Sequence, residues 1–159
     1  MATRLNVMLV DDSEAVLVLL QRAICTAAPD WDVRAVRGGK AALKFLEGED
    51  ALNQQERYPA PEVLLLDLNM PGMSGFDVLQ WVRASARWQH LVVILFSASE
   101  EQRDVNRAYA LGANSYLLKK TGFEELCQTF AMLDRFWRNA SFATVGALAT
   151  PARQGLSLE

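Results

Sequence analysis

The fold of this chain is decided by one stretch, residues 62–72, which reads EVLLLDLNMPG. The consecutive apolar residues Val63–Leu66 are typical of a strand buried on both faces of a parallel sheet. Pro71 and Gly72 then predict a turn. Asp67 therefore stands at the carboxyl end of a buried strand, where open parallel sheets place their ligands. From this stretch alone, a solvated carboxylate at a strand end is an equal alternative.

Three other apolar runs also end in polar side chains. They are Leu5–Val10 before Asp11 and Asp12, Leu91–Phe96 before Ser97, and Tyr116–Leu118 before Lys119. If all four runs are parallel strands of one sheet, their polar ends meet at one edge. Close carboxylates repel one another unless a cation lies among them, and oxygen ligands without His or Cys suit Mg²⁺. A divalent metal beside an Asp and a Lys is typical of phosphoryl transfer.

These residues resemble the receiver domain of two-component response regulators over roughly residues 4–137. The resemblance rests on four segments in this order and spacing, namely Val10–Asp12, Asp67–Gly75, Phe96–Ala98 and Gly112–Lys119. It implies an α/β, flavodoxin-like, doubly wound (βα)5 fold with a five-stranded parallel sheet in the order 2-1-3-4-5. We expect the receiver domain to span residues 1–138. Residues 139–159 form a flexible C-terminal tail on this interpretation, because their small and polar residues show little periodicity.

The resemblance also implies a role for the acidic residues. Asp67 is then the phosphoacceptor, whose carboxylate attacks the phosphorus atom of a phosphohistidine donor and forms an acyl phosphate. Asp11, Asp12 and Asp67 hold Mg²⁺ together with the backbone carbonyl of Asn69. The metal offsets the repulsion between the anionic nucleophile and the anionic phosphoryl group.

Lys119 and Ser97 are implied to bind the phosphoryl oxygens, the first as a point charge and the second as a hydrogen-bond donor. The alternative for Lys119 is a surface lysine with its ammonium group in solvent, which suits Lys120 better. The family usually has Pro where Lys120 stands, commonly after a cis peptide bond. Without Pro, either this bond is trans with an altered loop, or strain is stored there.

Ser97 and Tyr116 match the switch positions of the family. Movement of Ser97 toward the phosphoryl group vacates space that the Tyr116 ring can rotate inward to fill. The signal is then expected on the face formed by the helix at about 99–111, the strand 116–118 and the helix 123–137. The helix at 99–111 is poor in large apolar residues, so we expect it to be weakly packed, as a switching element must be.

The helix predicted at 123–137 is apolar on more than one face. Met132 and Phe136 lie outside the stripe formed by its other large apolar residues, and a helix packed on a sheet needs only about a third of its circumference apolar. We interpret Met132 and Phe136 as part of a partner or self-association surface. The alternative is that the tail folds back over them.

The most favoured function is that of a stand-alone response regulator, phosphorylated by a sensor histidine kinase and acting through phosphorylation-dependent protein contacts. The chain looks like the regulators that partner bacterial phytochromes, which often form homodimers through the face described above. A phosphate shuttle or sink in a phosphorelay is a second interpretation. An aspartyl-phosphate phosphohydrolase is a third, but such enzymes usually carry an Asp where Asn69 stands, so we expect no enzyme beyond slow self-dephosphorylation.

Composition limits the alternatives further. The 159 residues suffice for one domain, and a formal net charge of −3 argues against a nucleic-acid partner. No apolar run reaches the ~18 residues of a membrane span and no signal peptide is recognisable, so we expect a cytoplasmic protein without membrane contact. Cys25 and Cys127 lie in apolar helical contexts, which predicts buried thiols and no disulfide.

Capping motifs predict where the helices begin. Ser13 can cap a helix that should end before Pro29. Three further pairs have the spacing of a capping box or a near variant, namely Ser74 with Asp77, Ser99 with Gln102, and Thr121 with Glu124. The polar connection at 47–61 is unusually long, and a tolerated insertion is favoured there over a functional loop.

Overall fold

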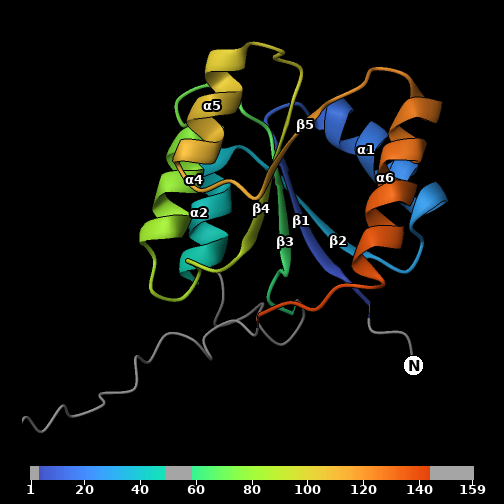
Figure 1. Cartoon of the computed structure of the whole chain (residues 1–159), viewed down its shortest axis with the longest axis horizontal. Coiled ribbons are helices and arrows are strands. Elements are labelled where there is room, and N and C mark those ends of the chain that lie inside the picture. Colours follow the sequence, from blue (N-terminus) through green and yellow to red (C-terminus); the bar gives the residue numbers. More distant parts are fainter. Residues whose placement is uncertain (1–3, 49–58, 144–159) are drawn as a thin grey trace, which may run out of the picture.

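The computed structural model describes residues 4–48 and 59–143, which form one α/β unit (Figure 1). Its five parallel strands lie in the order β2-β1-β3-β4-β5, which confirms the predicted flavodoxin-like topology. The strands are β1 (Asn6–Asp11), β2 (Asp32–Arg37), β3 (Val63–Leu66), β4 (Val92–Ser97) and β5 (Ser115–Leu118). All four residues of β3 are buried, as expected for the central strand of a sheet covered on both faces.

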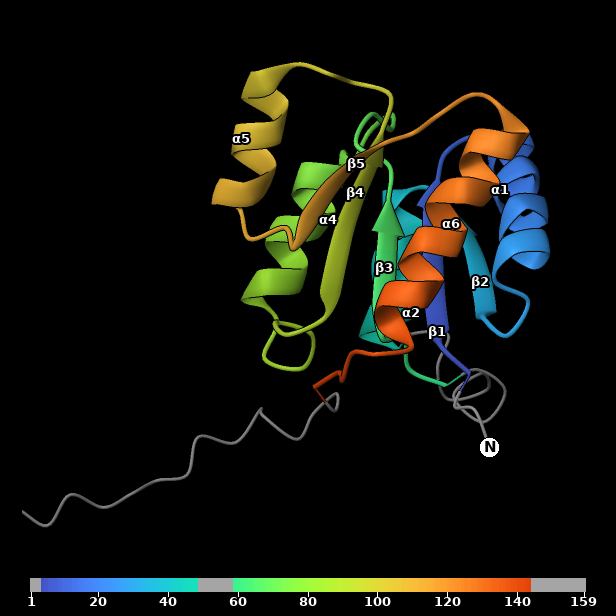
Figure 2. The same cartoon turned by 45° about the vertical axis from the view of Figure 1, so that its right-hand side comes forward.

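Within the described residues, five helices pack on the sheet. Figures 1 and 2 show that they cover both of its faces. On one face lie α1 (Glu14–Ala27) and α6 (Phe123–Trp137), and on the other lie α2 (Gly39–Glu47), α4 (Gly75–Ala84) and α5 (Gln102–Ala110). Each layer encloses its own hydrophobic cluster. The sheet therefore has two cores, and its carboxyl edge is left for polar side chains.

The helix starts agree with the predictions at two positions and differ at two. The Ser13 side chain accepts from Val16 N–H, and Ser74 forms a complete capping box with Asp77. The predictions for Ser99 and Thr121 are wrong. Helix α5 has Glu101 as its N-cap and α6 has Gly122, in both cases without a side-chain capping bond.

Packing of the helices follows the apolar pattern with one exception. Helix α1 ends at Ala27, before Pro29, and α5 buries only Ala108, as expected for a weakly packed helix. The prediction that both cysteines are buried is wrong for Cys25, which is exposed because it lies on the outer side of α1, while Cys127 is half-buried. Neither cysteine is in a disulfide.

Arg83, near the end of α4, joins two loops at the amino edge of the sheet, the one before β4 and the one before β5. Its Nε donates to the carbonyl of Gly112 at 2.8 Å, and Nη1 donates to the carbonyls of Gln89 at 3.0 Å and Leu91 at 2.7 Å. Its Nη2 donates to Asn114 Oδ1 at 2.9 Å, and the same oxygen accepts from the backbone N–H of Val93 in β4 at 2.8 Å. Arg83 therefore fixes the starts of β4 and β5 relative to α4.

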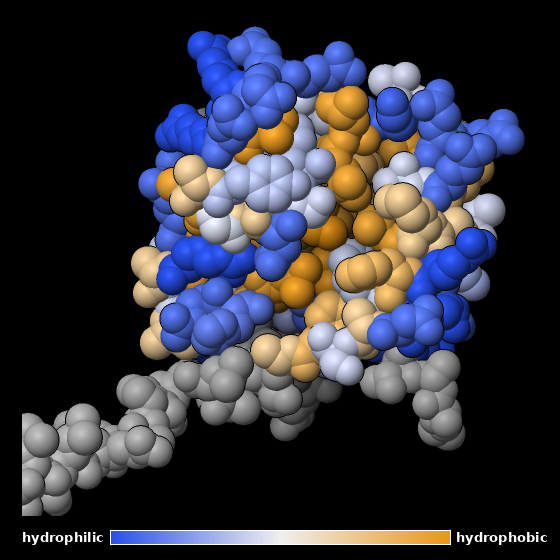
Figure 3. Space-filling model, viewed as in Figure 1, coloured by the Kyte–Doolittle hydropathy of each residue, from blue (hydrophilic) through white to orange (hydrophobic). Residues whose placement is uncertain are grey.

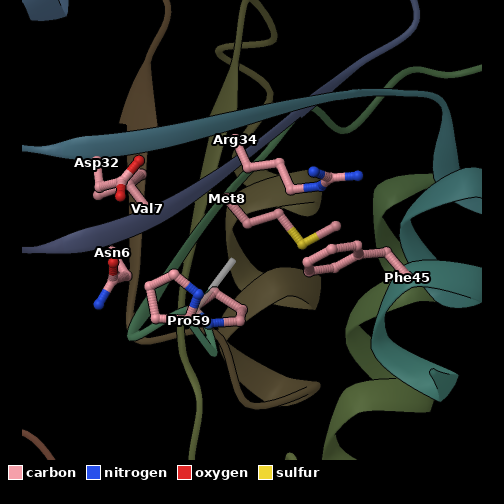
Figure 4. A pocket seen from close by; sticks show the side chains of 8 residues that line it. Asn6, Val7, Met8, Asp32, Arg34, Phe45 and Pro59 are labelled. Carbon is pink, nitrogen blue, oxygen red and sulfur yellow. The ribbon is translucent and has the colours of Figure 1, made fainter. Parts of the chain in front are cut away.

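A small cavity lies beside the amino ends of β1 and β2 (Figure 4). Its lining includes Asn6, Met8 and Pro59, and the guanidinium group of Arg34 lies over the Phe45 ring at 4.4 Å. Its volume of about 20 Å³ suits one water molecule. This cavity is at the opposite edge of the sheet from Asp67 and is too small for a substrate.

Two predictions fall partly outside the described residues. Most of the connection at 47–61 does so, and so does the tail from residue 144 onward. Helix α6 ends at Trp137, and Phe142 packs against that side chain with ring centroids 6.2 Å apart. The domain boundary at 138 stays a prediction. Of the helices in the described ranges, none combines the length and apolar character needed to cross a membrane.

Candidate functional site at the carboxyl edge of the sheet

The three predicted acidic residues lie together at the carboxyl edge of the sheet. Asp11 ends β1 and is 3% exposed, and Asp67 follows β3 and is 7% exposed. The Asp67 N–H donates to the carbonyl of Val10 at 2.9 Å, which fixes the two strand ends side by side. One carboxylate oxygen from each of Asp11, Asp12 and Asp67 lies within 4.8 Å of the others. The solvated strand-end alternative for Asp67 is therefore wrong.

Lys119 reaches into this cluster from the end of β5. Its Nζ donates to Asp11 Oδ2 at 2.7 Å and to Asp67 Oδ1 at 3.0 Å, and its side chain is 15% exposed. The surface-lysine alternative is therefore wrong for Lys119, whereas Lys120 is exposed. No peptide bond within residues 4–48 and 59–143 is cis, so the Lys119–Lys120 bond is trans, and the absence of Pro at 120 does not move Lys119 away.

Burial and charge act in opposite directions on these groups. Burial raises the pKa of Asp67, and the negative charges of Asp11 and Asp12 add to this, while Lys119 opposes it without restoring the ordinary value. Burial lowers the pKa of Lys119, but its hydrogen bonds and charge interactions with Asp11 and Asp67 raise it overall. The cluster therefore holds more negative charge than one lysine balances.

The donor set of this cluster fits a hard divalent cation. All candidate ligand atoms are carboxylate oxygens, and two of the three residues that supply them are buried. Asn69 lies two residues after Asp67 in the loop to α4 and is exposed. The role predicted for its backbone carbonyl stays a prediction.

The loop after Asp67 returns to the strand at a glycine. The Gly75 N–H donates to the carbonyl of Leu68 at 2.9 Å, and a Cβ atom at position 75 would lie 2.3 Å from the carbonyl oxygen of Asp67. Gly72 has φ of +79°, the left-handed conformation that the predicted turn needs. Only glycine therefore allows α4 to begin this close to Asp67.

Ser97 and Tyr116 meet at a residue that the sequence interpretation did not assign to the site. Ser97 is fully buried, and its hydroxyl accepts from Ser99 N–H at 3.1 Å. The Tyr116 hydroxyl donates to the carbonyl of Ser99 at 2.8 Å, and its half-buried ring packs on the core beneath α4 and α5. Both predicted switch residues are thus bonded to the same peptide segment. Their movement on phosphorylation stays a prediction.

Two other contacts at the site were missed. Ser13 N–H donates to Asp11 Oδ1 at 2.9 Å, and Arg37 Nε donates to the backbone carbonyl of Asp12 at 2.9 Å. The sequence indicated only a helix-capping role for Ser13. It gave no indication for Arg37, because the position of Arg37 depends on the pairing of β1 with β2. Both contacts orient the segment that supplies two of the three carboxylates.

Met132 and Phe136 lie away from this edge, on the outer side of α6. They are 54% and 64% exposed, so the described tail residues do not fold back over them. They line an apolar groove of about 560 Å³ whose other walls include Leu117 of β5 and Phe142. Figure 3 shows apolar side chains gathered in the centre of this face, between α5 and α6.

The chain is similar to known proteins in both sequence and fold. Residues 7–131 match the model of the response regulator receiver domain. The chain is 30% identical to response regulator Rcp1 of Synechocystis sp. over 131 residues, which cover 82% of this chain and 87% of that protein. The Mn²⁺-bound structure of Rcp1 has a TM-score of 0.74 at 28% identity, and covers 87% of this chain and 99% of its own.

Two further solved structures are similar. Response regulator RPA3017, in red light signaling of R. palustris, has a TM-score of 0.81 at 31% identity and covers 89% of this chain and 99% of its own. The phosphorylated cyanobacterial phytochrome response regulator RcpA has a TM-score of 0.78 at 26% identity, with 89% and 100% covered.

Receiver domains bind a divalent metal, are phosphorylated on an aspartate and pair with sensor histidine kinases. The carboxylate cluster beside Lys119 has the composition that these properties require. This chain therefore belongs to the response regulator receiver family, whose receiver domains act in signalling and have no catalytic function beyond weak self-dephosphorylation.

Proposed function

We propose that this protein is a cytoplasmic single-domain response regulator that accepts a phosphoryl group on Asp67 and signals through phosphorylation-dependent protein contacts. One observation carries this proposal, namely the position of Lys119 Nζ between Asp11 and Asp67. The buried carboxylate of Asp67 lies beside an ammonium group and two further carboxylates. This arrangement supports a role for Asp67 as a nucleophile next to a cation site.

The reaction is a transfer from a phosphohistidine. An oxygen of the Asp67 carboxylate attacks the phosphorus atom, a new O–P bond forms, and the N–P bond of the donor breaks as the imidazole leaves with its electron pair. Lys119 then donates hydrogen bonds to the phosphoryl oxygens in place of the free carboxylate, and Ser97 donates from the end of β4. Because Lys119 already contacts Asp67, little reorganisation is needed at this step.

We propose that Mg²⁺ is held by four residues, namely Asp11, Asp12 and Asp67 through their carboxylates and Asn69 through its backbone carbonyl. When bound, this ion supplies positive charge that offsets the repulsion between the incoming phosphoryl group and the carboxylates. The oxygen-only donor set supports Mg²⁺ over the metals that prefer nitrogen or sulfur.

The kinase that we propose as phosphodonor is of the phytochrome type. Support comes from RcpA, a phytochrome response regulator, and from RPA3017, which acts in red light signaling. The similarity to each extends over 89% of this chain.

The signal is proposed to leave through the face made by α5, β5 and α6. Helix α5 is weakly packed. The exposed Met132 and Phe136 of α6 line a groove whose floor includes Leu117 of β5. An apolar surface of this kind favours a second copy of the chain as the partner, because a homodimer can bury both grooves at once.

The acceptor role is tested by incubating the full chain with acetyl phosphate and Mg²⁺ and measuring its intact mass. We expect a gain of one phosphoryl group in the wild type and in Asp32→Asn, an exposed control at the other end of the sheet, but none in Asp67→Asn. No gain in the wild type, or a gain that persists in Asp67→Asn, overturns the proposal.

The dimer is tested by size-exclusion chromatography with light scattering on wild type and Met132→Asp/Phe136→Asp. Phe123→Asp is a matched control, because Phe123 is 44% exposed on α6 but does not line the groove. We expect a dimer in the wild type and the control, and a monomer in the double variant. A wild type that stays monomeric with and without phosphorylation rules out this interface.

A further inference from the structure

Tyr116 makes two hydrogen bonds, one through its ring hydroxyl and one through its backbone N–H. The ring hydroxyl donates to the carbonyl of Ser99 at 2.8 Å. The backbone N–H of the same residue donates at 3.2 Å to the hydroxyl of Tyr109, on α5. Because β5 is the last strand of the sheet, this N–H faces the open edge and would otherwise bond to water.

Tyr109 provides a contact for a helix that is otherwise weakly attached. Helix α5 buries only Ala108, so it has little apolar contact with the sheet. Two polar side chains of α5 also contact the domain. Asp104 accepts from the Ser99 hydroxyl at 2.8 Å, and Arg107 lies over the Phe76 ring at 4.3 Å. Among the described hydrogen bonds, Tyr109 makes the single one that joins an α5 side chain to β5.

These contacts form one continuous path of hydrogen bonds. Ser97 Oγ accepts from Ser99 N–H, the Ser99 carbonyl accepts from the Tyr116 hydroxyl, and Tyr116 N–H donates to Tyr109. Ser97 cannot move to a phosphoryl oxygen without releasing or shifting Ser99. That shift reaches Tyr116 through its hydroxyl and reaches α5 through Tyr109.

We propose that Tyr109 is a positioning residue, whose hydroxyl couples the state of Ser97 and Tyr116 to the position of α5. This inference rests on the proposed function, since it assumes that Ser97 responds to a phosphoryl group on Asp67. The inference adds Tyr109, which lies away from the carboxyl edge of the sheet. It places the conformational response on α5, a helix with few other contacts to the sheet.

The experiment compares wild type with Tyr109→Phe, which removes one hydroxyl and keeps the ring. Amide exchange is measured by NMR with and without beryllofluoride and Mg²⁺, where beryllofluoride stands in for the phosphoryl group. Without beryllofluoride, the Tyr116 amide should exchange about fivefold faster in Tyr109→Phe, as expected for the loss of one hydrogen bond. With beryllofluoride, the change in exchange across residues 102–110 should be at least about halved.

Two further variants distinguish a loss of coupling between Tyr116 and α5 from a general destabilisation of α5. Ala110→Ser changes a neighbouring exposed position of α5 and should behave as wild type. Tyr116→Phe removes the bond to Ser99, so combining it with Tyr109→Phe should add little to the loss of response in either single variant, because both bonds lie on one path.

Each failure has a distinct signature. An unchanged Tyr116 amide in Tyr109→Phe, or a full beryllofluoride response of α5 in that variant, overturns the role of Tyr109 while the proposed function stands. If the wild type itself shows no response to beryllofluoride, both the proposed function and this inference fail.

Discussion

Lys119 Nζ lies 3.0 Å from Asp67 Oδ1, although 52 residues separate the two side chains in the sequence. The ammonium group also contacts Asp11, so it holds two carboxylates that would otherwise repel one another. The charge that keeps the acceptor site folded before phosphorylation is thus the charge available to the phosphoryl group afterwards.

Replacing Asp67 with Asn should stabilise the protein in the absence of metal. Because burial raises the pKa of Asp67 in the folded state, the ionised carboxylate destabilises the fold near neutral pH. Lys119 keeps its bond to Asp11 in the variant. We expect the free energy of unfolding at pH 7.5 in EDTA to rise by about 1 kcal/mol, as measured by urea denaturation.

The pH dependence of this effect has a definite sign. Below about pH 3 Asp67 is largely protonated in both the folded and the unfolded state, so the variant and the wild type should have similar stability. As pH rises through the raised pKa of the folded state, the wild type loses stability relative to Asp67→Asn. A difference that grows toward acid pH would contradict the assignment.

Lys119→Ala should slow phosphorylation by acetyl phosphate about 10- to 100-fold, because a charge-assisted hydrogen bond contributes about 1.5 to 3 kcal/mol. Lys120→Ala is the matched control, since it removes the same charge from an exposed neighbour. Its rate should stay within about twofold of wild type. Intact mass against time measures both rates, and equal effects of the two variants would show that only net charge matters.

Asp11→Asn and Asp12→Asn should each weaken Mg²⁺ binding about tenfold or more, because each removes one anionic oxygen ligand from the cluster. Asp32→Asn changes the net charge equally and should leave the affinity unchanged. Titration calorimetry measures the dissociation constants. Loss of affinity in Asp32→Asn as well would point to diffuse charge attraction and not to a site.

Arg83→Ala should lower the free energy of unfolding by about 2 to 4 kcal/mol. The half-buried guanidinium group donates to three carbonyls and to Asn114, and its removal leaves these acceptors without it. Arg87→Ala, an exposed arginine nearby that stacks on Trp88 at 5.0 Å, should cost less than about 1 kcal/mol. Urea denaturation of both variants checks the difference.

The central strands and the site were predictable because they depend on order along the chain. Runs such as Val63–Leu66 end in functional side chains, and parallel strands bring these ends to one edge whatever the connecting helices do. The short-range bonds of Ser13 and Ser74 were predictable for a related reason, since both partners lie within three residues.

Contacts that depend on exact placement were not predictable. Ser99 has the spacing of a helix cap, but its hydroxyl accepts from Glu101 N–H and donates to Asp104, so a local turn replaces the expected capping box. Nothing in the sequence pairs the Trp31 indole with Asp134, 103 residues away, at 2.9 Å. The bond between Tyr109 and Tyr116 similarly requires the crossing of α5 over an open strand edge.

The glycine at position 75 has a consequence for how this protein can vary. A methyl group there would collide with backbone, which cannot rotate away as a side chain can, so even alanine would push α4 off the phosphoacceptor segment. A library of all substitutions at this codon, selected for folded protein, should return glycine almost alone. The start of α4 is therefore fixed by this one residue, and substitutions that keep the fold must lie elsewhere in the chain.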